Sequence, residues 1–268
     1  MMKFHYNFFL LLLAAELFSC KGTFQFSPNQ IILKDTEKNL TAKNIERIKL
    51  LAATDTVRFI VASDTHQWLD ETADFVKSAN AQRSISFVIH LGDLSSTGIA
   101  QEYKWFYEIM SGLNVPYLTA AGETDLMDKG AVYHEMFGME DYSFEIANAK
   151  FIIINTNSSV NNNDGLVPNV SWLKSQLSNN TDNKATIVLA HTPPFDKNFN
   201  KNMEKQYVEL LRADSNFKIS IYGHQHAFNE STPYNDGVKY IVTTSMKKKE
   251  YLIISVYKNG YHVNTISF

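Results

Sequence analysis

The sequence predicts an α/β fold in which buried strands alternate with amphipathic helices. Six short apolar runs recur between residues 57 and 222, and helical spacing of apolar residues fills several of the gaps between them. Short apolar runs bounded by polar residues are typical of buried strands, and their alternation with helices indicates an α/β sheet. Asp or His residues follow most of the runs, at the edge where open α/β sheets bind ligands.

The predicted elements follow in chain order. We expect strands over residues 57–62, 87–91, 115–121, 151–154, 186–190 and 217–222, and helices over residues 69–83, 99–112, 169–178 and 202–213. The C-terminal third carries three further apolar runs with no helices between them, over residues 238–244, 251–256 and 261–267. Consecutive strands without crossover helices are typical of antiparallel pairing, so these three are expected to form a meander.

Composition fits one folded domain. The chain has 268 residues, of which 44% are hydrophobic and 20% charged, which is enough apolar material for one large α/β core. The formal charge of −3 shows no basic excess, so no nucleic-acid binding is predicted. The basic run over residues 247–249 is interpreted as a solvated turn rather than a phosphate contact. The oligomeric state is not predicted.

Residues 1–20 are predicted to be a lipoprotein signal peptide. Their apolar stretch, over residues 8–15, is too short to span a bilayer. The Leu-x-Ser-Cys sequence that ends at Cys20 resembles a bacterial lipobox, and Cys20 is the only cysteine. A secretory signal cut nearby is the alternative. A lipid on Cys20 would hold the protein on a membrane of the bacterial cell envelope, with a tether and short helix over residues 21–52 and one domain over residues 53–268.

Metal-ligand residue types recur at the predicted strand ends. The sequences are Asp64-Thr65-His66, Gly92-Asp93, His191 within Ala-His-Thr-Pro, and Gly223-His224-Gln225-His226. Mixed carboxylate and imidazole sets suit zinc, iron or manganese better than calcium or magnesium. A carboxylate can bridge two ions, and two ions about 3.5–4 Å apart can clamp the attacking and leaving oxygens of a phosphoryl transfer. The sequence therefore predicts a dinuclear hydrolytic site with two divalent or trivalent transition metal ions (Mn, Fe or Zn).

These motifs, in this order, resemble those of the calcineurin-like metallophosphoesterase family over about residues 57–230. The resemblance implies two packed mixed β-sheets flanked by helices, a phosphoester substrate and two metal ions. It also implies a ligand role for each motif: Asp64, His66 and His226 for the first ion, Asp93 as the bridge, and His191 and His224 for the second ion.

The loop after the third predicted strand departs from the family pattern Gly-Asn-His-Asp/Glu. It reads Gly122-Glu123-Thr124-Asp125, so Glu123 takes the place of the asparagine ligand and Thr124 that of the catalytic histidine. A carboxylate is a stronger donor to a divalent ion than an amide oxygen, and Glu123 is predicted to be a ligand. A threonine hydroxyl cannot donate a proton near pH 7 as an imidazole can, so altered or reduced activity is expected. The predicted catalytic residues are Asp93, His191 and Thr124.

Two interpretations of function stay open. In the first, the chain hydrolyses phosphate mono- or diesters with a metal-activated water, either without an acid at position 124 or with His134 as its replacement. In the second, it is a catalytically degenerate surface protein that binds a phosphorylated or polyanionic ligand. The retained ligand types favour the enzyme. Neither Gly-x-Ser-x-Gly nor Gly-x-Gly-x-x-Gly occurs, so serine hydrolases and dinucleotide-binding enzymes are not indicated. The loops over residues 157–169 and 194–202 are expected to form the rim.

Overall fold

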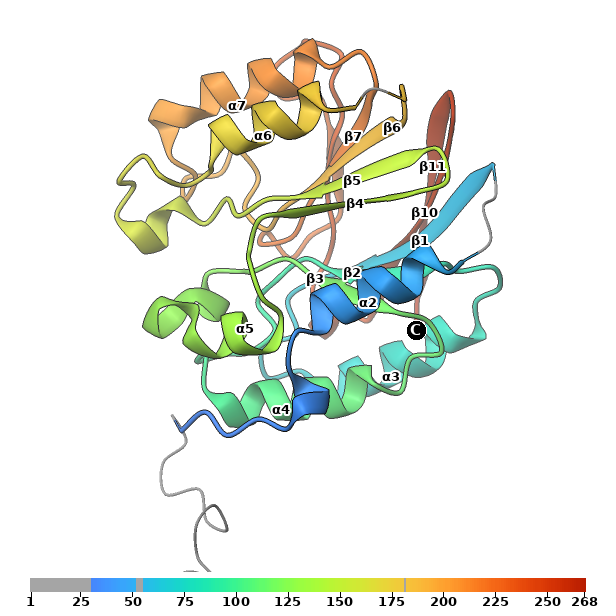
Figure 1. Cartoon of the computed structure of the whole chain (residues 1–268), viewed down its shortest axis with the longest axis vertical. Helices are drawn as coiled ribbons and strands as arrows, with labels where there is room; N and C mark the ends of the chain where they lie inside the picture. The colour runs from blue at the N-terminus through green and yellow to red at the C-terminus, as the bar shows by residue number, and fades with distance from the viewer. Residues whose placement is uncertain (1–29, 52–54, 181) are drawn as a thin grey trace, which may run out of the picture.

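Two mixed β-sheets pack face to face, as the family resemblance implies (Figure 1). The computed structural model describes residues 30–51, 55–180 and 182–268. The first sheet has the strand order β11 (Gly260–Ser267), β10 (Glu250–Tyr257), β1 (Thr56–Ala62), β2 (Phe87–His90) and β3 (Tyr117–Thr119). The second has the order β4 (Tyr142–Ile146), β5 (Ala149–Ile153), β6 (Ala185–Leu189), β7 (Phe217–Tyr222), β9 (Tyr240–Val242) and β8 (Asn229–Ser231).

Helices cover the outer face of each sheet. On the first sheet lie α3 (Leu69–Ala81), α4 (Ala100–Met110) and α5 (Ala131–Met136), and on the second lie α6 (Val170–Ser178) and α7 (Lys201–Ala213) (Figure 1). Alternation along β1 builds both layers, because successive side chains of a strand face opposite ways. Phe59 and Val61 pack between the sheets, whereas Ile60 and Ala62 pack against the helices.

The helix α2 (Leu40–Lys49) covers the edges of both sheets. It contacts β3, at the edge of the first sheet, and β4, at the edge of the second. Ile48 is fully buried in the core between the sheets, and the Asn44 side chain donates a hydrogen bond to the carbonyl of Tyr117 at 2.8 Å. The predicted short helix is therefore packed on the domain, and it shields two edges that would otherwise expose unpaired backbone groups.

The four predicted helices are confirmed, with ends within two residues, and all six predicted strands of the α/β region are present. The predicted C-terminal meander is wrong. Only β10 and β11 pair with each other, and β10 also pairs antiparallel with β1. The strand β9 instead pairs parallel with β7 in the other sheet. Among the described residues, β4 and β8 are edge strands that the apolar runs did not reveal.

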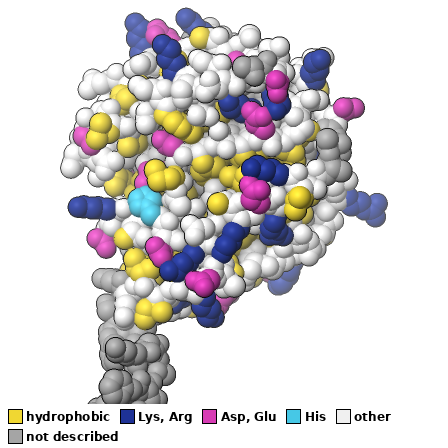
Figure 2. Space-filling view, viewed as in Figure 1, with side chains coloured by type: hydrophobic (Ala, Val, Ile, Leu, Met, Phe, Trp, Pro, Cys, Tyr) yellow, Lys and Arg dark blue, Asp and Glu magenta, His cyan; other side chains and the backbone are white. Residues whose placement is uncertain are grey.

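The described surface mixes both signs of charge. On the face in Figure 2, Lys and Arg side chains alternate with Asp and Glu side chains rather than forming one field. No helix in the described ranges is long and apolar enough to cross a membrane. The predicted signal peptide, Cys20 and the first part of the tether, residues 21–29, lie outside the described residues.

Candidate metal centre

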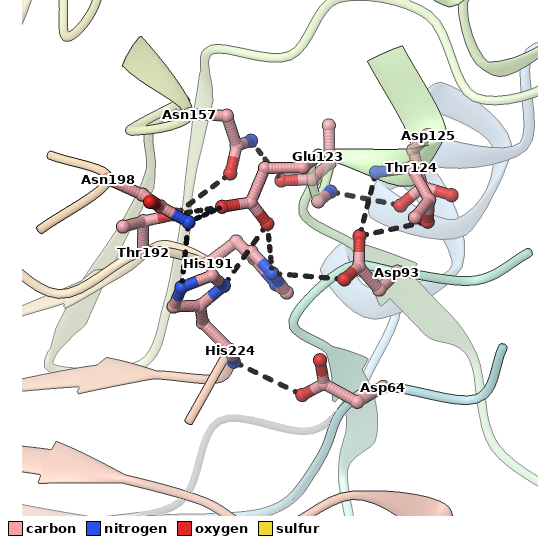
Figure 3. Close-up of polar contacts among 12 residues, drawn as sticks. Asp64, Asp93, Glu123, Thr124, Asp125, Asn157, His191, Thr192, Asn198 and His224 are labelled. Atoms are coloured by element: carbon pink, nitrogen blue, oxygen red, sulfur yellow. Dashed lines mark hydrogen bonds and ion pairs between the residues drawn. The ribbon is translucent and has the colours of Figure 1, made fainter. Parts of the chain in front are cut away.

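The predicted ligand residues lie at the carboxyl ends of strands from both sheets. Figure 3 shows Asp64, Asp93, Glu123, His191 and His224 among them. The loops after β1, β2 and β3 supply Asp64, His66, Asp93 and Glu123, and the loops after β6 and β7 supply His191, His224 and His226. Their donor atoms form overlapping groups of three, and within each group all atoms lie within 4.8 Å of one another. The site is therefore one cluster that spans the two sheets.

Unusual backbone geometry positions these side chains. Five of the seven adopt a left-handed backbone with φ between 45° and 69°: Asp64, His66, Asp93, His224 and His226. Such conformations are costly for residues other than glycine and cluster at functional sites. Two glycines let the loops after β2 and β3 touch: a Cβ on Gly92 would collide with the backbone of Gly122, and a Cβ on Gly122 would collide with the Asp93 carboxylate.

The first group contains Asp64, His66 and His226. Asp64 Oδ1 lies 3.0 Å from His226 Nε2 and 3.8 Å from His66 Nε2. Asp64 is fully buried, whereas the His226 side chain is 45% exposed and that of His66 is 17% exposed. In this group the carboxylate is therefore buried in the core, and the two histidines are partly exposed to solvent.

The second group contains Glu123, His191 and His224. Glu123 Oε2 lies 2.8 Å from His191 Nε2 and 3.2 Å from His224 Nδ1. Asp93 lies between the two groups, because its Oδ2 is 3.5 Å from His66 Nε2 and 3.4 Å from His191 Nε2. One carboxylate oxygen therefore faces an imidazole of each group, which is the arrangement expected of a bridging ligand.

His191 shows that the donor set fits a cation. Its Nδ1 lies 2.6 Å from the carbonyl of Leu91, to which it can only donate, so in the neutral ring Nε2 carries the lone pair. That Nε2 is buried and faces the carboxylates of Asp93 and Glu123 at 3.4 and 2.8 Å. Two carboxylates around this nitrogen require a positive charge there, either a proton on Nε2 or a metal ion bound by its lone pair.

The pKa shifts of these side chains also indicate that the site favours a positive charge. Burial opposes a charge on His191, but the Asp93 and Glu123 carboxylates raise its pKa well above the ordinary value. Burial likewise opposes ionisation of the two carboxylates, yet His191 lowers the pKa of Asp93 to about 2, and His191 with His224 holds the pKa of Glu123 far below its usual range. Protons would occupy this site in the absence of metal ions.

A hydrogen-bond network holds the Glu123 carboxylate in place (Figure 3). Its Oε1 lies 3.2 Å from Thr192 Oγ1 and 3.5 Å from Asn198 Nδ2, which leaves Oε2 to the two histidines. Thr192 Oγ1 is also 3.0 Å from Asn157 Oδ1, and the Asn157 amide donates to the Ala121 carbonyl at 2.7 Å. Thr192 was not predicted as a site residue, and Asn157 was predicted only as the first residue of a rim loop. Their positions after β5 and β6, at the same sheet edge, are the signal that could have indicated them.

Asp196 orients His224 from the side opposite to Glu123. Its Oδ1 lies 3.4 Å from His224 Nε2, while His224 Nδ1 faces Glu123. Its Oδ2 accepts a hydrogen bond from the Gln225 side chain at 2.9 Å. A carboxylate on one imidazole nitrogen places the proton there and leaves the other nitrogen free to bind a metal ion. Asp196 lies in a predicted rim loop, but its role was not predicted.

Thr124 faces the bridging carboxylate. Its backbone N–H donates to Asp93 Oδ1 at 2.9 Å, and its hydroxyl lies 2.9 Å from the same oxygen and 2.7 Å from the carbonyl of Ser95. These contacts occupy Asp93 Oδ1 and leave Oδ2 toward the two groups. Asp125 is buried and accepts hydrogen bonds from the amides of Leu94 and Gly122, so it holds the loops together.

His134, a candidate replacement acid that sequence alone favours as a surface histidine, takes no part in the metal-ligand groups of the described residues. It lies on α5, where its Nε2 contacts Glu140 at 2.7 Å and its side chain is largely exposed. Of the rim candidates, Asn198 reaches Glu123 and lies 3.3 Å from His224 Nε2. Asn200 instead accepts a hydrogen bond from the Asn202 amide at the start of α7.

Comparisons with known proteins agree with this fold. Residues 57–228 match the calcineurin-like phosphoesterase family. No curated protein matches the chain in sequence. Among solved structures, a purple acid phosphatase from yellow lupin (Lupinus luteus) seeds aligns with a TM-score of 0.63 at 14% identity, over 81% of this chain and 52% of that chain. The chain thus spans about half the length of that phosphatase.

Two further solved structures share the fold along most of their length. A dimetal phosphatase from Danio rerio aligns with a TM-score of 0.57 at 13% identity, over 79% of this chain and 99% of that one. GAP50, described as the anchor in the inner membrane complex of Plasmodium, aligns with a TM-score of 0.58 at 16% identity, over 80% and 85%. At such identities these likenesses establish the fold, and the family match covers more than half of the sequence. The chain belongs to the calcineurin-like phosphoesterase family.

Proposed function

We propose that the protein is a metal-dependent phosphoesterase that hydrolyses phosphate mono- or diesters at a dinuclear centre. The position of Asp93 is the observation that carries this proposal, since its Oδ2 lies 3.5 Å from His66 Nε2 in one ligand group and 3.4 Å from His191 Nε2 in the other. Asp64, His66 and His226 would hold the first ion, Glu123, His191 and His224 the second, and Asp93 both. Two transition metal ions (Mn, Fe or Zn) would supply Lewis acidity and an activated water.

The protein side chains set the geometry of the reaction. Leu91 and Asp196 fix the two histidines of the second group, Thr192 fixes Glu123, and Thr124 fixes Asp93. Thr124 acts in this scheme as a positioning residue rather than as a proton donor. Losing a general acid typically costs about 10²- to 10⁴-fold in rate, so hydrolysis should favour esters whose leaving group departs without a proton.

Metal content together with hydrolysis tests the proposal. The purified protein should bind close to two transition metal ions per chain and release nitrophenolate from nitrophenyl phosphate or bis(nitrophenyl) phosphate. Asp93→Asn should lower metal content and abolish hydrolysis, because it removes the shared ligand. Asp74→Asn is the control, since Asp74 pairs with Lys77 and Lys249 at the surface. A wild-type chain that binds no metal after reconstitution would disprove the proposal.

A binding protein without turnover is the second candidate. It is favoured by one observation, the engagement of the Thr124 hydroxyl with Asp93 and Ser95 where the family pattern has a catalytic histidine. Such a protein would bind two metal ions and inorganic phosphate but hydrolyse none of the aryl esters. Metal and phosphate binding without product formation would establish this alternative.

We also propose that a lipid on Cys20 holds the protein in the bacterial cell envelope. The lipobox-like sequence and the absence of any other cysteine support this. If so, Cys20→Ser should move the protein from the membrane fraction to the soluble fraction when it is expressed in a bacterium that lipidates such signals.

A further inference from the structure

Lys247 lies over the indole ring of Trp68, with its Nζ 4.8 Å from the ring centroid. The Lys247 side chain is exposed and Trp68 is half-buried. No carboxylate among the described residues lies within ion-pair distance of Lys247, whereas the nearby Lys249 pairs with Asp74 at 3.1 Å. An aromatic face attracts a cation without neutralising it, so the charge of Lys247 is held in place but remains available to an anion.

Both residues of this pair belong to segments that contact the first ligand group. The Trp68 amide donates to the Thr65 carbonyl at 2.8 Å, which closes the turn that contains His66. On the other side, the amide of Met246 lies 3.3 Å from the carbonyl of Asp64. Lys247 follows Met246 directly, so the pair lies beside the loop that carries two predicted metal ligands.

His226, in the first ligand group, is the most exposed of the predicted metal ligands. Its side chain is 45% exposed, against 17% for His66, 18% for His224 and 19% for Glu123. An anion that reaches the metal centre from solvent can therefore approach past His226, in the group whose Asp64 loop contacts the segment that leads into Lys247.

The net charge of the predicted metal centre gives a reason for an additional cation, the Lys247 ammonium, beside it. With two divalent ions, the three carboxylates of Asp64, Asp93 and Glu123 leave the centre with a net charge of +1. If position 123 carried the asparagine of the family pattern, the net charge would be +2. A weaker positive centre attracts a phosphate less, and an ammonium beside the opening restores part of the lost attraction.

In place of the solvated turn expected from the sequence, we propose that Lys247, held by Trp68, is a substrate-binding residue whose ammonium pairs with a phosphate oxygen at the metal centre. The inference rests on the proposed function and adds a specificity determinant to it. Lys247 contributes attraction for the anion, and Trp68 limits the conformations that the lysine side chain samples before the anion binds. Its effect is on binding rather than on the chemical step.

Calorimetric titration of the metal-loaded full-length chain with inorganic phosphate tests this. Lys247→Gln should weaken phosphate binding by roughly 3- to 10-fold at low salt, with a smaller difference at high salt. Lys247→Arg should retain most of the affinity. The matched control is Lys248→Gln, which removes the neighbouring exposed lysine and should change the affinity by less than about twofold. In hydrolysis, Lys247→Gln should raise KM and leave kcat nearly unchanged.

Trp68 provides a readout that does not depend on turnover. In a chain with Trp105→Phe and Trp172→Phe, phosphate should change the indole emission, and adding Lys247→Gln should remove most of that change. If the wild-type chain binds phosphate and Lys247→Gln binds it equally well, this inference is wrong and the proposed function stands. If the metal-loaded wild-type chain binds no phosphate, both are wrong.

Discussion

Glu123 and Thr124 alter two different properties of the metal centre. Glu123 adds a negative charge while its Oε2 keeps the position between His191 and His224 that a second-ion ligand requires. Thr124 donates its backbone N–H to Asp93 Oδ1, and its one hydroxyl hydrogen is shared between that oxygen and the Ser95 carbonyl. It has no group that can release a proton near neutral pH. We therefore expect this departure from the family pattern to keep the ligand geometry and to remove proton donation to the leaving group.

Restoring both family residues should accelerate hydrolysis selectively. We expect the double variant Glu123→Asn with Thr124→His to raise kcat/KM for an alkyl phosphate by about 10- to 100-fold, because an alkoxide leaving group needs a proton. The gain for nitrophenyl phosphate should be much smaller, since nitrophenolate leaves unprotonated. Thr124→Ser keeps the hydroxyl contacts with Asp93 and serves as the control. An equal gain for both esters, or none, would contradict the role assigned to position 124.

Asp196 should matter for the second ion alone. Asp196→Asn removes the negative charge beside His224 Nε2, so the imidazole is less firmly held with its Nδ1 toward Glu123. We expect about tenfold weaker binding of one of the two ions, measured by competition with a chromophoric chelator. Asp182→Asn is the control, because Asp182 is exposed and contacts only Lys184 in the described part of the chain. Equal loss of both ions would show that Asp196 does not act through His224 on the second ion alone.

At the scale of elements, periodicity located the helices because burial along a helix is a local property. The buried residues of α3 are Thr72, Phe75, Val76 and Ala79, at the spacing of one helical face. Sheet membership is not local, and the apolar runs of β9 and β10 look alike although they pair in different sheets. Ligand types and spacing likewise predicted the residues that the fold brings together in the candidate metal centre, whereas Asn157, Thr192 and Asp196 are common polar residues whose contacts depend on loops brought together by folding.

The helix α2 should contribute to stability although it precedes the part of the chain that matches the family. Ile48→Ala would leave a cavity between the two sheets and should reduce the free energy of unfolding by about 2–4 kcal/mol. Leu50→Ala, at a side chain that is 86% exposed just after the helix, should change it by less than about 0.5 kcal/mol. Urea denaturation measures both. Equal effects would mean that α2 adds little to the core in solution.

His90 in β2 should make the protein sensitive to acid. It is fully buried with Nε2 3.0 Å from Thr65 Oγ1, and burial lowers its pKa from 6.5 to about 3. The unfolded chain therefore takes up a proton between pH 6.5 and 3 that the folded chain does not, so stability falls as pH falls through this window.

The variant His90→Gln, which can still hydrogen-bond to Thr65, isolates this contribution. Between pH 7 and pH 5 the metal-free wild type should lose about 2 kcal/mol more than His90→Gln, measured by urea denaturation at each pH. Parallel losses in the two proteins would show that His90 does not titrate in this way.

At the scale of the whole molecule, the candidate metal ligands come from both sheets. Asp64, His66, Asp93 and Glu123 come from the first sheet, and His191, His224 and His226 come from the second. The unfolded chain separates these ligands, so ions that bind the folded centre favour the packed arrangement of both sheets. Sequence order alone could not show this, because it places the ligands along the chain but not on opposing sheets.

Metal removal should therefore destabilise the entire fold. At free metal concentrations 100-fold above the dissociation constant, each ion adds about 2.7 kcal/mol to the free energy of unfolding. Chelation should lower the melting temperature measured by calorimetry, and added metal should restore it. Asp93→Asn loses the ligand that faces both groups, so its melting temperature should respond much less to chelator. A wild-type protein that binds two ions but melts at the same temperature with and without them would show that the ions do not hold the sheets together.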